Sequence, residues 1–183
     1  MPTMPGIEKK DKQWMDMAVA MSKNSKCMRA HYGCIVLNKE GRLIGGGYNG
    51  KPAGACNDGV CYREGLEANA EKGGKGEKVC CIHAETNTLF WTPHTDRVGG
   101  TLYASGVPCR SCMLNLLNSG LARIVYLDEP ATSGHKGDAD LEFFKEYGID
   151  IKLVPFSYYE WTYLHALETF KEMQLKRIYA KPH

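Results

Sequence analysis

The spacing of the cysteines is the feature that most restricts how this chain can fold. Residues 1–12 contain no apolar segment typical of a secretory signal, and no apolar run approaches the ~20 residues that span a membrane. We therefore predict a cytoplasmic protein, in which clustered cysteines favour metal binding over disulfides. The chain has eight cysteines, most of them close together in sequence: Cys27, Cys34, Cys56, Cys61, Cys80, Cys81, Cys109 and Cys112.

The length and net charge of the chain limit its number of domains and its possible partners. A chain of 183 residues that is 43% hydrophobic fits one compact domain over residues 1–183 with a full apolar core. The net charge of +2 lacks the concentrated excess of lysine and arginine that nucleic-acid binding requires. We therefore expect neither a nucleic acid nor a membrane as partner.

Hydrophobic periodicity and turn residues predict an alternating series of helices and strands. The hairpin should turn at residues 39–41, and Gly- and Lys-rich residues 51–80 form a long loop insertion. This order predicts a three-layer α/β/α sandwich around a five-stranded mixed sheet. The predicted helices cover residues 11–26, 83–91, 109–120, 139–148 and 157–178, and the strands begin at about Cys34, Leu43, Thr101, Ala122 and Ile149.

Two short motifs supply the donors of a catalytic metal site. Cys109 and Cys112 are spaced to put both thiolates on one face at the start of a helix, whose N-terminus favours negative charge. His83 begins another helix and adds a neutral nitrogen, which leaves a fourth position for water. Mixed thiolate and imidazole ligation favours zinc over iron or copper. Glu85 is poorly placed to coordinate the same metal, but it can reach a metal-activated water and accept its proton.

Each motif has a simpler interpretation when taken alone. The C-x-x-C string could be a redox pair or half of a structural zinc site, and H-x-E by itself carries little information. Their combination, H-x-E followed by P-C-x-x-C, is the signature of zinc-dependent nucleobase deaminases. We therefore place the catalytic hypothesis ahead of the structural and redox ones.

Four longer strings indicate a particular family of deaminases. The strings are GYNG at residues 47–50, KPAGACND at 51–58, CIHAETN at 81–87 and GVPCRSC at 106–112. With these strings, the sequence over residues 12–155 resembles the deoxycytidylate (dCMP) deaminase family, which has the cytidine deaminase-like fold. The resemblance implies hydrolysis of dCMP to deoxyuridylate (dUMP) and ammonia, in pyrimidine nucleotide biosynthesis that supplies thymidylate. One departure is Tyr32-Gly33-Cys34, where the family usually has Val-Gly-Ala.

The resemblance also suggests substrate contacts. It places Asn49 at the deoxyribose, Arg29 at the phosphate, and Ala84 and Tyr126 along the pocket. Arginine suits a phosphate because its planar fork donates two parallel hydrogen bonds. Simpler roles remain open: Asn49 as a turn residue, Arg29 as a surface charge, and Tyr126 as part of the core.

The remaining cysteines resemble a second, structural zinc site found in some family members. A metal would stabilise a long loop that has little core of its own. The alternative is that these cysteines are small buried apolar residues. The candidate ligands are Cys27, Cys56, Cys61 and Cys80, with Cys81 as the alternative to Cys80.

Family resemblance further implies regulation and assembly. Many relatives are homohexamers that dCTP activates and dTTP inhibits, with Mg²⁺ bound to the triphosphate. The loop after Asn49 and residues 90–97 are where we expect such an effector. The competing hypotheses are another zinc deaminase, acting on a nucleoside, a free base, a riboflavin precursor or a nucleic acid, and a non-catalytic zinc scaffold.

Overall fold

The computed structural model describes residues 9–27, 30–52, 81–127 and 146–154, and everything below refers to these residues. They form helices α1 to α4 and strands β1 to β5. The helices are α1 (Lys9–Ser22), α2 (Ala84–Trp91), α3 (His94–Arg97) and α4 (Arg110–Leu117), and the strands are β1 (Gly33–Leu37), β2 (Leu43–Tyr48), β3 (Thr101–Ala104), β4 (Arg123–Leu127) and β5 (Asp150–Val154).

The strands form one mixed, five-stranded sheet in the order β2-β1-β3-β4-β5. β1 is antiparallel to both β2 and β3, whereas β3, β4 and β5 run parallel. All strands except β1 therefore end at the same edge of the sheet. At that edge the register places Cys34 between Gly47 and Ala104.

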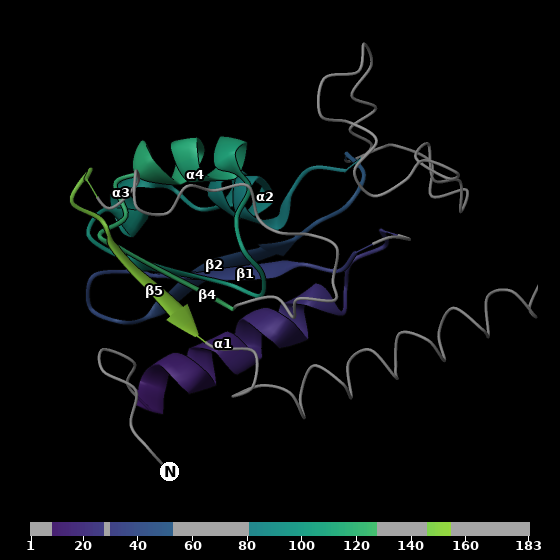
Figure 1. The fold of residues 1–183 in the computed structure, drawn as a ribbon, viewed down its shortest axis with the longest axis horizontal. Coiled ribbons are helices and arrows are strands. Elements are labelled where there is room, and N and C mark those ends of the chain that lie inside the picture. Colours follow the sequence, from purple (N-terminus) through teal and green to yellow (C-terminus); the bar gives the residue numbers. More distant parts are fainter. Residues whose placement is uncertain (1–8, 28–29, 53–80, 128–145, 155–183) are drawn as a thin grey trace, which may run out of the picture.

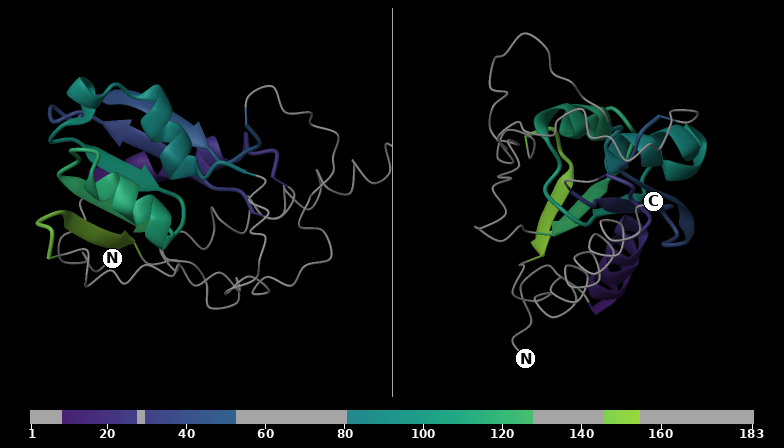
Figure 2. Two further views of the ribbon diagram at one scale, coloured as in Figure 1. Left: turned by 90° about the horizontal axis from the view of Figure 1, so that it is seen from above. Right: turned by 90° about the vertical axis from the view of Figure 1, so that its right-hand side faces the viewer.

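Helices cover both faces of the sheet, which confirms the predicted three-layer architecture. α1 packs on one face, and α2, α3 and α4 lie on the other (Figure 1). Figure 2 shows the same division from two further directions. Residues of β1 alternate between the layers, because successive side chains of a strand point to opposite faces. Cys34 and Val36 join the core under α2 and α4, whereas Ile35 and Leu37 join the core against α1.

The predicted hairpin is present. The Asn38 carbonyl accepts from Gly41 N–H at 2.9 Å, and the Asn38 side chain accepts from Arg42 N–H at 2.8 Å. Gly41 has a φ of 77°, which glycine adopts without steric cost. The turn therefore lies where its sequence indicated.

Helix α2 lies unusually close to strand β2. A Cβ atom added at Gly47 would lie 2.7 Å from Thr88 Oγ1 and 2.9 Å from Thr88 N, too close for any side chain. The Asn87 side chain donates to the Tyr48 carbonyl at 2.9 Å. Gly47 therefore lets the helix approach, and the Asn87 hydrogen bond helps to fix its position on the sheet.

Some boundaries differ from those predicted. α1 ends at Ser22 and not at residue 26, because hydrogen-bonded turns take over at Lys23, Asn24 and Ser25. The single turn of α3 was not predicted. Arg97 anchors it, donating to the carbonyls of Ser119, Leu89 and Thr92.

Several predictions lie outside the described residues. These are residues 53–80 of the predicted loop insertion, residues 139–145 of the helix predicted at 139–148, and the whole helix predicted at 157–178. Among the helices described, none is long and apolar enough to cross a membrane.

A buried ion pair ties α1 to the sheet. Asp11 is 2% exposed and accepts two hydrogen bonds from the Arg123 guanidinium, at 2.6 and 2.9 Å. The Tyr103 hydroxyl donates to the same carboxylate at 2.7 Å. This hydrogen bond and the burial of the phenol raise the pKa of Tyr103 above its ordinary value, with burial the larger cause.

We predict that Asp11→Asn lowers the free energy of unfolding by about 2–3 kcal/mol, because it removes the buried one of the two carboxylates that pair with the partly buried Arg123 guanidinium and leaves only the exposed Asp150. Asp16→Asn on the same helix is the control. Burial raises the pKa of Asp16, so the fold does not favour its charge, and its loss should change stability by less than about 0.5 kcal/mol. Urea unfolding measures both, and equal effects would contradict the assigned role of Asp11.

Candidate metal centre

His83 lies at the point where an extended segment becomes helix α2. Ile82 pairs with Gly50 in an isolated bridge, with N···O distances of 2.8 and 3.1 Å. His83 then has extended backbone angles and caps the helix. Its ring is exposed, and its carbonyl accepts from Asn87 N–H at 2.9 Å. This junction directs the imidazole away from the sheet and toward α4.

Cys109 and Cys112 lie at the start of helix α4. Cys109 is the N-cap residue, and its sulfur accepts from Cys112 N–H at 3.5 Å. Pro108 stands directly before this cap residue. Cys112 is 2% exposed, and Cys109 is half-buried. The C-x-x-C spacing therefore brings both sulfurs to one end of the helix, as predicted.

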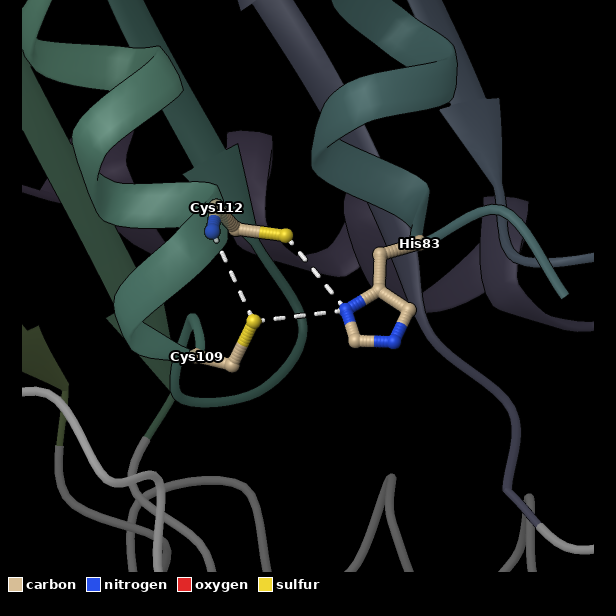
Figure 3. A group of neighbouring side chains, drawn as sticks. All are labelled: His83, Cys109 and Cys112. Atoms are coloured by element: carbon tan, nitrogen blue, oxygen red, sulfur yellow. Dashed lines mark hydrogen bonds between the residues drawn. The ribbon is translucent and has the colours of Figure 1, made fainter. Parts of the chain in front are cut away.

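The three donors converge on one point (Figure 3). His83 Nδ1 lies 3.5 Å from the Cys109 sulfur and 3.4 Å from the Cys112 sulfur. All the ligand atoms of the three side chains lie within 4.8 Å of one another. A tetrahedral zinc would hold a thiolate sulfur and a histidine nitrogen roughly 3.5 Å apart. The side chains therefore fit zinc, with Nδ1 as the donor nitrogen.

The two thiols are electrically unequal. Hydrogen bonds with Cys112, the larger effect, and with His83 together lower the pKa of Cys109 to about 4, against the opposing effect of burial. The same bond with Cys109, then burial and the Glu85 charge, raise the pKa of Cys112. Cys109 is thus the thiolate of the pair, and a bound cation would favour ionisation of both.

Glu85 faces this cluster from the buried side of α2. It is 7% exposed, and burial is the main cause that raises the pKa of its carboxyl group. The charge of Cys109 raises that pKa further, whereas a backbone hydrogen bond and His83 lower it. In the described part of the chain, the ligand cluster contains His83, Cys109 and Cys112 without Glu85. The carboxyl group therefore lies beside the cluster without belonging to it, and its role in proton exchange stays a prediction.

The predicted substrate contacts have other neighbours in the structure. The Asn49 side chain accepts from Tyr32 N–H at 2.8 Å and donates to the Ala30 carbonyl at 2.9 Å. Tyr126 is 4% exposed and belongs to the same core cluster as Ala84. A carboxamide has further donor and acceptor capacity, so a sugar contact for Asn49 stays a prediction, as do the contacts of Ala84 and Tyr126.

The remaining candidates are only partly described. Arg29, Cys56, Cys61 and Cys80 lie outside the described residues. Cys27 and Cys81 are described, and both are half-buried. The second zinc site therefore stays a prediction.

Sequence reasoning missed Thr86, whose hydroxyl lies 3.7 Å from the Cys112 sulfur. Its position offered one signal. Residues three apart on a helix share a face, so a polar residue three positions after His83 should point toward the same neighbour.

Two helix starts that bring a histidine and two cysteines together beside a buried glutamate define a zinc-dependent hydrolytic deaminase. Residues 8–128 match the family model described as "Cytidine and deoxycytidylate deaminase zinc-binding region". The chain belongs to this family and is an enzyme that hydrolyses C–N bonds.

Individual relatives agree with this assignment. The chain is 35% identical over 122 residues to "Deoxycytidylate deaminase" of Mycobacterium phage D29, which covers 65% of this chain and 94% of the relative. It is 37% identical over 121 residues to "Deoxycytidylate deaminase" of Schizosaccharomyces pombe, covering 63% of this chain but 36% of that longer protein.

A solved structure shares the fold. The dCMP deaminase of cyanophage S-TIM5, in apo form, superposes with a TM-score of 0.58 at 20% identity, covering 81% of this chain and 100% of that one. The cytidine deaminase-like fold predicted from the sequence is therefore confirmed.

We predict that Cys112→Ala removes one zinc equivalent per chain, because two protein ligands cannot hold the metal as three do. Cys34→Ala is the matched control. Cys34 is an equally buried thiol, 1% exposed, that lies outside the ligand cluster, so this variant should keep its zinc. Elemental analysis of the purified proteins measures both, and zinc loss from Cys34→Ala would contradict the assignment.

Proposed function

We propose that the protein converts deoxycytidylate and water into deoxyuridylate and ammonia. The observation that carries this proposal is its similarity to the phage D29 deoxycytidylate deaminase, over nearly the whole length of that relative. The His83, Cys109, Cys112 and Glu85 arrangement supplies the matching chemistry. The dUMP formed would feed thymidylate synthesis in the cytoplasm.

Glu85 moves the protons in this proposal. A zinc ion held by the three side chains would supply Lewis acidity that makes water a nucleophile near neutral pH. The Glu85 carboxylate accepts a proton from the attacking water and gives it to the ring nitrogen. It then assists proton delivery to the amino group, which leaves as ammonia. A carboxyl group whose pKa is raised by burial suits both directions of transfer.

The remaining residue roles complete the substrate site. Arg29 would bind the phosphate, Asn49 the deoxyribose, and Ala84 and Tyr126 the base. The Asn49 side chain already holds the backbone at Ala30 and Tyr32. A sugar hydroxyl would therefore meet a carboxamide whose orientation is fixed before binding, which lowers the entropic cost of recognition.

Regulation and a second metal belong to the same proposal. We expect a homohexamer that dCTP activates and dTTP inhibits, with Mg²⁺ on the triphosphate and residues 90–97 among the effector contacts. We also expect a structural zinc on Cys27, Cys56, Cys61 and either Cys80 or Cys81. The elemental analysis described above should then give two zinc ions per wild-type chain, and one would contradict the second site.

We predict that dCMP is the preferred substrate in an ammonia-release assay that also contains deoxycytidine and cytidylate. Deoxycytidine should have a kcat/KM lower by about 10- to 100-fold, because it lacks the charge-assisted hydrogen bonds of the phosphate. Cytidylate tests the sugar contact. Equal rates for deoxycytidine and dCMP would contradict the nucleotide assignment, and ammonia from none of the three would contradict the proposed function.

We predict that Glu85→Gln keeps its fold and its zinc but loses about 10²- to 10⁴-fold in kcat. The amide matches the carboxylate in shape but cannot accept the proton. Circular dichroism and elemental analysis verify that fold and metal are intact, so that the loss reports proton transfer alone. Activity close to wild type would mean that another group moves the protons.

A further inference from the structure

Thr86 contacts the metal-binding cluster from the side of α2 that faces α4. Its hydroxyl oxygen lies 3.7 Å from the Cys112 sulfur, at hydrogen-bonding distance for sulfur. The two residues come from different helices, so this contact does not follow from local sequence. It bridges the helix that begins after His83 and the helix that carries both cysteines.

The other threonines of this region use their hydroxyls differently. Thr88 donates to the Ala84 carbonyl at 2.7 Å and Thr92 to the Thr88 carbonyl at 2.8 Å, the usual bonds to the residue four positions earlier. For Thr86 that residue is Ile82, whose carbonyl already accepts from Gly50 N–H. The Thr86 hydroxyl turns to the sulfur instead.

The direction of the hydrogen bond follows from the charge on sulfur. A metal-binding cysteine is a thiolate and has no proton to donate, so the Thr86 hydroxyl must be the donor. Cys112 is 2% exposed, so water has little access to replace this donor. Cys109 receives the comparable bond from Cys112 N–H. Each of the two sulfurs thus has a protein donor.

We propose that Thr86 is a positioning residue of the metal centre, whose hydroxyl donates to the Cys112 thiolate, fixes the direction of its sulfur and withdraws electron density from it. Two thiolates beside the Glu85 carboxylate put three negative charges around one divalent cation. Donors to sulfur disperse part of this charge and leave the metal a stronger Lewis acid. The inference rests on the proposed metal-dependent function, but it can be tested without turnover.

The test uses Thr86→Val, which keeps the shape of the side chain and removes the hydroxyl. Competition with a chelator should show zinc affinity about 10-fold weaker. In the Co²⁺-substituted protein the sulfur-to-cobalt charge-transfer band should move to longer wavelength, because the sulfur electrons are no longer stabilised by a donor. Thr86→Ala should behave alike, and Thr86→Ser should restore both readings.

Thr88→Val is the matched control, since it removes a hydroxyl from the same helix that donates to a carbonyl and not to sulfur. It should leave the cobalt band in place. The proposal would be overturned by a Thr86→Val band and affinity equal to wild type, by equal changes in Thr86→Ser, or by the same band shift in Thr88→Val. Absence of dCMP turnover would count against the proposed function and leave these readings unaffected.

Discussion

The convergence of two helix starts at one edge of the sheet is the constraint on which the site depends. β2 and β3 run in the same direction because each is antiparallel to β1. Chain leaving the carboxyl end of either strand therefore emerges at one edge. α4 begins just beyond the end of β3, and the bridge between Gly50 and Ile82 places α2 just beyond the end of β2. Open α/β sheets bind ligands at such edges for this reason. Here the same geometry brings the imidazole of His83 together with the sulfurs of Cys109 and Cys112.

The electrostatics of the site follow from where these groups are buried. Glu85 and Cys112 are almost completely covered, whereas His83 is exposed. Burial raises the pKa of the carboxyl group, and the cysteine charge beside it raises that pKa further. A divalent cation would reverse the balance by favouring every anionic group around it. The protein thus keeps a protonatable carboxylate next to a cluster that is suited to positive charge, which is the combination that a proton-coupled hydrolysis needs.

The sequence predicted the metal-binding cluster and the carboxyl group beside it far better than the contacts around them, and the reason is physical. His83, Glu85, Cys109 and Cys112 are specified by short spacings at helix starts, where local geometry decides which side chains share a face. The positions of strands β1 and β4 were also predictable from the sequence, because both are nearly continuous apolar runs that are buried on both faces. Asn49 shows the limit. Its bonds to Ala30 and Tyr32 join residues far from it in sequence, and no periodicity encodes such contacts. The ion pair of Asp11 with Arg123 is hidden for the same reason.

Contacts on the buried face of helix α2 determine where the residues that face α4 are placed. Ala84, Glu85 and Thr88 form its buried face, and the close approach of Thr88 to Gly47 leaves the helix little freedom to slide or rotate. Asn87 fixes the same helix through the Tyr48 carbonyl. With the helix held in this position, the side chains of His83 and Thr86 point to α4, where the sulfurs lie. Gly47 therefore acts on the metal-binding cluster without touching it: a larger residue there would push away the helix that begins after His83 and carries Glu85 and Thr86.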